Sequence, residues 1–176
     1  YNIDALMPDA MALRPGGKTG DGINLAHLLV GSEGTLAISK TITLKLSPLR
    51  AKKVMGVCHF PTFYKAMDAA QHLVTLDPVA VELIDSTKLD LARSIAIFKS
   101  TVEQYVRGTP AALLVVEFAE DDHSENQRKL AELEKMMAGL GYGWDKPASA
   151  TGGLVCLSEP EDQARITEMR KSGLNI

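Results

Sequence analysis

The stretch AALLVVEFAE (residues 111–120), with the helical pattern DHSENQRKLAELEKMMAGLG (122–141) directly after it, decides the fold class of this chain. The first segment has a continuous apolar centre, which predicts a strand at the centre of a sheet or buried on both faces. The second is acidic at its start, ends in glycines, and places five apolar residues on one helical face: Leu130, Leu133, Met136, Met137 and Leu140. Together they predict a domain in which helices pack against a sheet.

Similar patterns flank this pair on both sides. Strands are expected at 52–60, 78–85 and within 143–157, and helices at 61–76, 86–95, 98–108 and 159–173. The helix at 61–76 is expected to bury Phe63, Met67, Ala70 and Val74, which recur at helical spacing. From residue 51 the order is β-α-β, two helices, then β-α-β-α. It predicts an α+β, ferredoxin-like (split β-α-β) domain, an antiparallel sheet with helices on one face.

The first 48 residues have a different character. Residues 1–22 are rich in Gly, Pro and Asp and are expected to form a long loop. One or two helical turns are expected over 23–30, with Asn24 as the N-cap. The alternation in TLAISKTITLKLSP (35–48) predicts a strand that ends at Pro48. A strand and loops are too little for a core of their own, so we divide the chain into domains at 1–48 and 49–176.

Composition and scattered polar residues exclude several classes of function. The net charge of −3 and pI near 5.8 argue against a nucleic-acid-binding domain. No apolar run approaches the roughly 20 residues of a membrane helix, so we expect a cytoplasmic protein, with peripheral membrane association as the alternative. Cys58 and Cys156 are expected to be small buried residues in a reducing compartment. No metal site is expected, because the histidines lack ligand spacing; we expect His59 and His72 to be packed and His123 to be solvated.

A glycine-punctuated segment, Gly31-Ser32-Glu33-Gly34-Thr35, precedes the expected strand. Its backbone N–H groups could form a concavity that accepts oxygen atoms of a ligand. It is not a nucleotide P-loop, since no Lys follows and the next element is a strand rather than a helix. From these residues alone, a tight turn without a ligand is favoured.

Several segments resemble FAD-linked oxidases of the vanillyl-alcohol oxidase type. LLVGSEGTLAISKTITLKLSPL (28–49) is similar to the end of their flavin-binding domain, and four later segments follow in the order of their cap domain: CHFPTFYKAMDAAQHL, PVAVELIDSTKLDLARS, LLVVEFAEDD and EDQARITEMRKSGLNI. The last of these resembles the subgroup fused to an iron–sulfur domain, which are 2-hydroxyacid dehydrogenases of the D-lactate and D-2-hydroxyglutarate kind. The sequence departs from the family pattern at Ala37, often Gly, and at Thr167, which stands where a W-x-x-R motif has Trp.

This resemblance implies roles for individual residues. One wall of an FAD site would be formed by Gly31, Ser32, Glu33, Gly34 and Thr35, with Leu36 and Ile38 approaching the flavin through backbone groups. Arg170, the Arg of the W-x-x-R position, would hold the substrate carboxylate in a bidentate fork. The alternative for Arg170 is an exposed helix residue paired with Glu168 or another local carboxylate. We expect Glu82, a polar residue inside an apolar strand, to face solvent on the open face of the sheet; contact with the active-site side is the alternative.

The resemblance also implies that the chain is an internal fragment. It begins at Tyr1 without a Met, and the family's phosphate-binding glycine loop would precede it. A His-bearing metal and base motif, and the cysteines of any iron–sulfur cluster, would follow Ile176. We therefore expect the fragment alone to lack FAD and activity, and the whole enzyme to pass electrons from a small 2-hydroxyacid to an iron–sulfur centre or another acceptor. Two alternatives stay open: a non-catalytic ferredoxin-like module that binds a ligand or partner, and an oxygen-using flavin alcohol oxidase.

Overall fold

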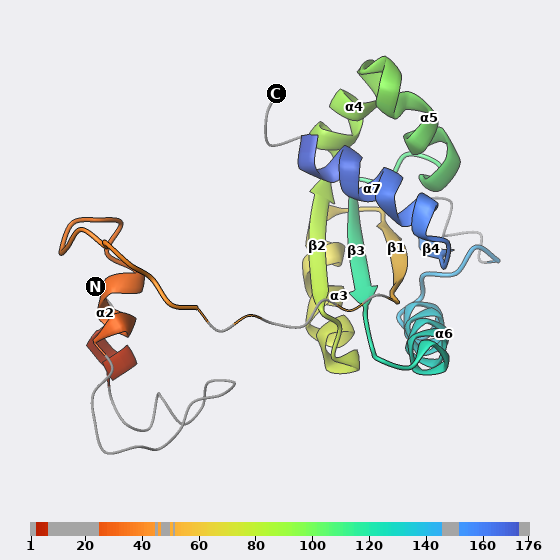
Figure 1. Cartoon of the computed structure of the whole chain (residues 1–176). Coiled ribbons are helices and arrows are strands. Elements are labelled where there is room, and N and C mark those ends of the chain that lie inside the picture. Colours follow the sequence, from red (N-terminus) through yellow and green to blue (C-terminus); the bar gives the residue numbers. More distant parts are fainter. Residues whose placement is uncertain are drawn as a thin grey trace. The chain divides into compact units, whose positions relative to one another are not determined.

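The computed structural model describes residues 3–6, 25–44, 46, 50, 52–145 and 152–172. The chain divides into two compact units, Tyr1–Ser47 and Pro48–Ile176. Both are drawn in Figure 1, where the colours follow the sequence.

The larger unit is built on one antiparallel sheet. Its strands are β1 (Val54–Phe60), β2 (Ala80–Asp85), β3 (Ala112–Phe118) and β4 (Gly153–Leu157), in the spatial order β2-β3-β1-β4. β3 lies between β1 and β2, and β1 lies between β3 and β4, with antiparallel pairing at every interface. Each β-α-β unit is therefore split by a strand of the other, which confirms the predicted α+β, ferredoxin-like arrangement.

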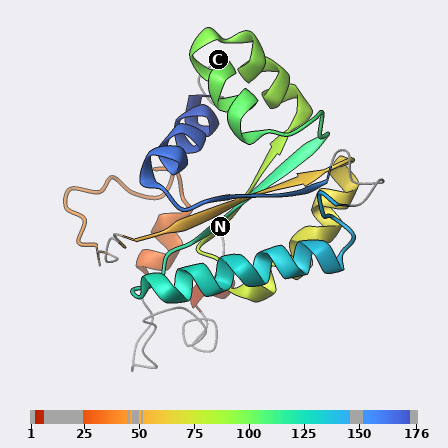
Figure 2. The same ribbon diagram turned by 90° about the vertical axis from the view of Figure 1, so that its right-hand side faces the viewer.

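Helices cover both faces of this sheet, so the expectation of helices on one face is wrong. Two of them, α3 (Phe63–Leu73) and α6 (His123–Gly139), lie on one side, and three lie on the other: α4 (Ser86–Ser94), α5 (Ala96–Tyr105) and α7 (Pro160–Ser172). Figure 2 shows the sheet nearly edge-on between these two layers. The reason lies in β3, where Leu114 belongs to the core under α6 and Leu113 to the core under α5 and α7. A strand that is apolar on both faces needs cover on both.

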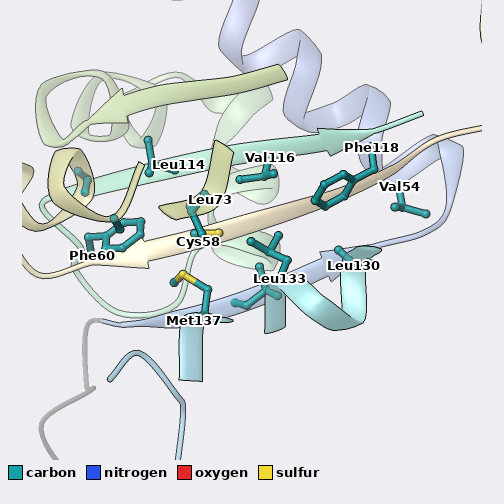
Figure 3. Close-up of a cluster of buried hydrophobic side chains, with 14 residues drawn as sticks. Val54, Cys58, Phe60, Leu73, Leu114, Val116, Phe118, Leu130, Leu133 and Met137 are labelled. Atoms are coloured by element: carbon teal, nitrogen blue, oxygen red, sulfur yellow. The ribbon is translucent and has the colours of Figure 1, made fainter. Parts of the chain in front are cut away.

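The core under α3 and α6 is drawn in Figure 3, where Phe60, Cys58 and Leu114 from the sheet face Leu133 and Met137 of α6. All five of these side chains are buried. Leu133 and Met137, together with Leu130, lie on the helical face that the sequence predicts, and Met136 and Leu140 pack partly against the same core. The long amphipathic helix is thus confirmed in type and in its buried face.

Helix α3 presents a different face from the predicted one. Its buried residues are Ala66, Ala69 and Leu73. The predicted residues are more open to solvent: Phe63, Met67 and Val74 are 50%, 41% and 52% exposed, and Ala70 is half-buried. Both stripes recur at helical spacing, and the two alanines allow the helix backbone to lie close to the close-packed sheet.

Two further expectations about single residues are wrong. His72, in the last turn of α3, is exposed rather than packed. Cys156 is exposed on the edge strand β4, while Cys58 on the central strand β1 is buried as expected, and neither forms a disulfide. His123 at the start of α6 is exposed, as the sequence predicts. These outcomes follow from position, because an edge strand and an outer helical face leave side chains open to water.

The smaller unit contains a 3-10 helix, η1 (Ile3–Leu6), and a short helix, α2 (Ala26–Val30). The rest of the expected loop 1–22 lies outside the described residues, as does Asn24. The prediction of Asn24 as the N-cap is wrong, because Leu25 occupies that position in α2 and makes no side-chain capping bond. The predicted strand at 35–48 is absent over 35–44 and 46. A strand needs a neighbour to accept its hydrogen bonds, and the described part of this unit contains none. The alternating apolar side chains are consequently exposed, with Ile38 98% accessible and Ile42 67%.

Candidate functional site

The first candidate is the glycine-punctuated turn after α2. The N–H of Thr35 donates to the carbonyl of Ser32 at 2.9 Å, and the hydroxyl of Thr35 donates to the same oxygen at 2.6 Å. The two residues between them have positive φ, 49° at Glu33 and 79° at Gly34. This is the φ pattern of a type I′ turn, which glycine adopts without cost and Glu adopts rarely. The turn is therefore tightly specified by its own hydrogen bonds.

The backbone of this turn is accessible at its glycines and at two of its N–H groups. Added Cβ atoms at Gly31 and Gly34 would meet nothing within 4 Å. In the described part of the chain, no acceptor lies opposite the backbone N–H groups of Glu33 and Gly34. Ser32 is buried, while its neighbours in the turn are exposed. The predicted residues Gly31 to Thr35 thus form one local unit, and Leu36 and Ile38 continue from it as an exposed segment without regular structure.

The second candidate is Arg170, in the last part of α7. Its Nη1 atom donates to Oε1 of Glu82 on β2, a partner 88 residues away in the sequence. The side chains are 22% and 39% exposed, respectively. Arg170 is thus paired with a distant carboxylate rather than with Glu168. The expectation that Glu82 faces solvent is wrong, because Glu82 points to the α7 side of the sheet and is half-buried there.

The register of the sheet explains how Glu82 reaches Arg170. Glu82 lies opposite Val115 of β3, and Val115 belongs to the core that α7 covers with Ile166 and Met169. Side chains of paired residues share one face of the sheet, so the carboxylate of Glu82 emerges under the helix. The sequence signal for this was a carboxylate within an otherwise apolar strand.

A groove of about 600 Å³ runs beside α7. Its walls combine the two residues before β1, the start of α6 and one face of α7, with Lys52, Lys53, Thr167, Glu168 and Lys171 among the lining residues. Lys53 is paired with Glu117 at 3.2 Å, and the hydroxyl of Thr167 donates to the carbonyl of Gln163 at 2.8 Å. Arg170 does not line this groove, so the groove and the Arg170–Glu82 pair are separate features.

His59 is the most strongly perturbed histidine, and its surroundings mark it as structural. Its Nε2 accepts from the backbone N–H of Arg107 at 3.1 Å, which assigns the proton to Nδ1, and Nδ1 donates to the carbonyl of Val57 at 3.0 Å. Trp144 meets it edge-on, with ring centroids 5.1 Å apart. Burial lowers the pKa of His59 to about 4. A neutral, fully hydrogen-bonded ring confirms the prediction that His59 is packed rather than catalytic.

Two other classes of site have no counterpart in the described ranges. No three His, Cys, Asp or Glu side chains there gather closely enough to hold a metal ion. None of the helices in the same ranges has the length and apolar character needed to cross a membrane.

Comparison with known proteins identifies the larger unit. The model of the family described as FAD linked oxidases, C-terminal domain, matches residues 49–175. A D-lactate dehydrogenase of Archaeoglobus fulgidus is 29% identical over 135 residues, which cover 74% of this chain and 29% of that protein. A D-2-hydroxyglutarate dehydrogenase of Pantoea ananatis is 32% identical over 158 residues, covering 87% of this chain and 15% of that protein.

A third relative is the mitochondrial D-lactate dehydrogenase [cytochrome] of Arabidopsis thaliana, 28% identical over 159 residues that cover 89% of this chain and 25% of that protein. The chain spans less than a third of the length of each of these relatives. The family match extends over most of the chain, from the start of the larger unit to α7. The chain therefore belongs to the FAD-linked oxidases, and its residues 49–175 are their C-terminal domain.

Proposed function

We propose that this chain supplies part of a flavin-dependent dehydrogenase that oxidises a 2-hydroxyacid of the D-lactate or D-2-hydroxyglutarate type. The observation that carries the proposal is the family match over 49–175, together with the names of the relatives that align with it. In this proposal residues 1–48 contribute to the flavin-binding region and residues 49–176 form the cap over the substrate.

The turn at 31–35 is the part of the chain that we assign to the flavin. Its open glycines allow close approach, and the backbone N–H groups of Glu33 and Gly34 have no acceptor within the described residues. These groups fit a ligand that presents neutral acceptor oxygens, such as ring carbonyls, because the exposed carboxylate of Glu33 would repel a phosphate. The chemistry that FAD supplies when bound is acceptance of a hydride from the α-carbon of the hydroxyacid.

Arg170 is the residue that we assign to the substrate carboxylate. A guanidinium has five N–H donors in a planar fork, and the bond to Glu82 uses one of its nitrogens, Nη1. Within the described part of the chain, Nε and Nη2 have no acceptor, so one edge of the fork is left for a carboxylate. An Arg that is already paired and partly buried is ordered before the substrate arrives, which favours tight binding of a carboxylate.

The electrons removed from the hydroxyacid must pass to an acceptor. An iron–sulfur centre elsewhere in the polypeptide is our proposal for the first acceptor, and direct use of oxygen is the second candidate. The non-catalytic module is the remaining alternative. It differs in one measurable respect, because a module of that kind would turn over no hydroxyacid with any acceptor.

The test is a steady-state assay of the full-length protein with D- and L-2-hydroxyacids and an artificial electron acceptor. We expect one enantiomeric series to be oxidised. Substitution Arg170→Ala should lower kcat/KM by roughly 30- to 1000-fold, which corresponds to a lost charged hydrogen bond of about 2–4 kcal/mol. Lys171→Ala is the control, because Lys171 is the exposed neighbour on the same helix. An unchanged kcat/KM in Arg170→Ala would refute the carboxylate role.

A further inference from the structure

We infer that Glu82 is a positioning residue, which holds the guanidinium of Arg170 so that its free edge meets the substrate carboxylate. The inference rests on the proposed function of Arg170 and adds a second residue to the site. Glu82 would touch no substrate itself, since it acts through Arg170. The pair joins α7 to the edge strand β2 on the face of the sheet that α7 covers. The orientation of Arg170 is therefore set by a residue from another element and not by a neighbour on its own helix.

The contrast with a second Arg of α7 supports this assignment. Arg165 pairs at 2.9 Å with Glu161, one turn earlier on the same helix, and those side chains are 44% and 79% exposed. Exposed pairs of that kind contribute little and fix no geometry. The partner of Arg170 instead comes from another element, and the Arg170 side chain is half as exposed as that of Arg165. Arg170 therefore has a fixed anchor that Arg165 lacks.

A guanidinium that Glu82 already holds in place also loses less conformational entropy when the substrate binds. Arg carries large rotamer freedom, which a substrate must remove if it alone orders the side chain. The bond from Nη1 to Glu82 removes part of that freedom before the substrate arrives. Because the remaining N–H edge keeps the planar fork, it can meet a carboxylate with two parallel bonds. Loss of Glu82 should thus weaken binding of an acid while leaving the chemistry of bound substrate nearly unchanged.

The experiment compares variants of the full-length protein on two substrates, the preferred 2-hydroxyacid and its primary amide, which lacks the carboxylate. The variants are Glu82→Gln, which keeps the size and one acceptor, Glu82→Ala, Arg170→Ala and the double variant of both alanines. Glu161→Gln is the matched control, because it neutralises the exposed partner of Arg165 on the same helix. Thermal unfolding of each variant is measured in parallel.

We expect Glu82→Gln to raise KM for the acid about tenfold, the size of one charged hydrogen bond, with kcat changed less than twofold. Glu82→Ala should raise it further, and neither variant should change kcat/KM for the amide. For the acid, kcat/KM of the double variant should be no lower than that of Arg170→Ala alone, because both substitutions remove the same function, binding of the carboxylate. Glu161→Gln should match the unmodified protein on both substrates.

Two outcomes would overturn the inference while the proposed function stands. One is loss of acid turnover in Arg170→Ala with no change in the Glu82 variants. The other is an equal loss on acid and amide, together with a lowered unfolding temperature, which would make the pair a purely structural tie. If Arg170→Ala itself leaves acid turnover unchanged, the carboxylate role of Arg170 is wrong, and the two failures are thereby distinguished.

Discussion

Acidification should destabilise the larger unit through His59. This ring is buried, hydrogen-bonded at both nitrogens and neutral, and burial lowers its pKa from 6.5 to about 4. In the unfolded chain the same ring is exposed and has its ordinary pKa. Between these two values the unfolded state therefore binds a proton that the folded state excludes, so the folded state loses stability as the pH falls.

The size of the effect follows from the difference between the two values. At pH 7 both states carry a neutral ring, and the stability associated with His59 is fully present. Each pH unit below 6.5 costs about 1.4 kcal/mol until the folded ring also protonates near pH 4. The total loss from this one residue is about 3 kcal/mol, a large part of the stability of an ordinary domain.

The assay is urea unfolding at pH 7 and pH 4.5, followed by fluorescence. The chain has a single Trp, and Trp144 lies edge-on to His59 and donates from Nε1 to the carbonyl of Leu154 at 2.8 Å. Acidic residues also respond to pH, so the measure is the difference between the unmodified chain and His59→Gln. His72→Gln, on the exposed side of α3, is the control for removal of a histidine.

We expect the free energy of unfolding of the unmodified chain and of His72→Gln to fall by roughly 2–3 kcal/mol more than that of His59→Gln over this pH range. An imidazole NMR titration of the unmodified chain gives a second measurement that does not depend on a variant's folding. Titration of the His59 ring near pH 6.5, or full pH dependence in His59→Gln, would show that this ring does not cause the loss of stability in acid.

Three other predictions concern packing and hydrogen bonds in the larger unit, each measured by urea unfolding. Gly56→Ala should cost about 1–3 kcal/mol, because the new Cβ would lie 2.5 Å from a leucine side chain in the core; Gly139→Ala, with open space around its Cβ, should cost nothing. Asn126→Ala should cost about 1–3 kcal/mol, because this buried amide accepts from the N–H of Glu120 at 2.7 Å. A variant as stable as the unmodified chain would contradict this role. Tyr105→Phe should cost about 1 kcal/mol at pH 7 through loss of the 2.5 Å bond to Asp162.

Local patterns were sufficient for most of the fold. The strand β3 and the helix α6 carry their structure in consecutive residues. The start of α4 is likewise local, because Asp85 caps it by accepting from the N–H of Lys88 at 2.8 Å. The order of elements then implies the split β-α-β sheet. What the pattern did not reveal was the second helical layer, because α4, α5 and α7 bury their apolar sides only in the context of the assembled sheet.

The errors arose where a pattern fits two environments. Both faces of α3 have apolar spacing, and packing against the sheet selects the one with Ala66 and Ala69. The alternation at 35–48 is typical of a strand, but a strand forms only beside a partner, which the described residues of the smaller unit do not provide. The physical decision in both cases depends on a neighbour that is distant in sequence.

The candidate site also has one part that local sequence predicts and one part that depends on the assembled fold. The turn at 31–35 could be predicted, because two glycines three residues apart favour a tight reversal, although the positive φ of Glu33 could not. The pairing of Arg170 with Glu82 depends on the register of β2 against β3 and on the placement of α7. A carboxylate in an apolar strand indicates that a partner is needed, but it does not indicate which one.

Anaerobic mixing of the full-length protein with single 2-hydroxyacids shows whether it is a flavin-dependent 2-hydroxyacid dehydrogenase. The flavin absorbance is followed in one turnover with D-lactate, D-2-hydroxyglutarate and their L-enantiomers, without any added electron acceptor. We expect bound flavin whose absorbance is bleached by one of the D-acids and not by its L-enantiomer. Absence of bound flavin, or a flavin that no 2-hydroxyacid bleaches, would contradict it.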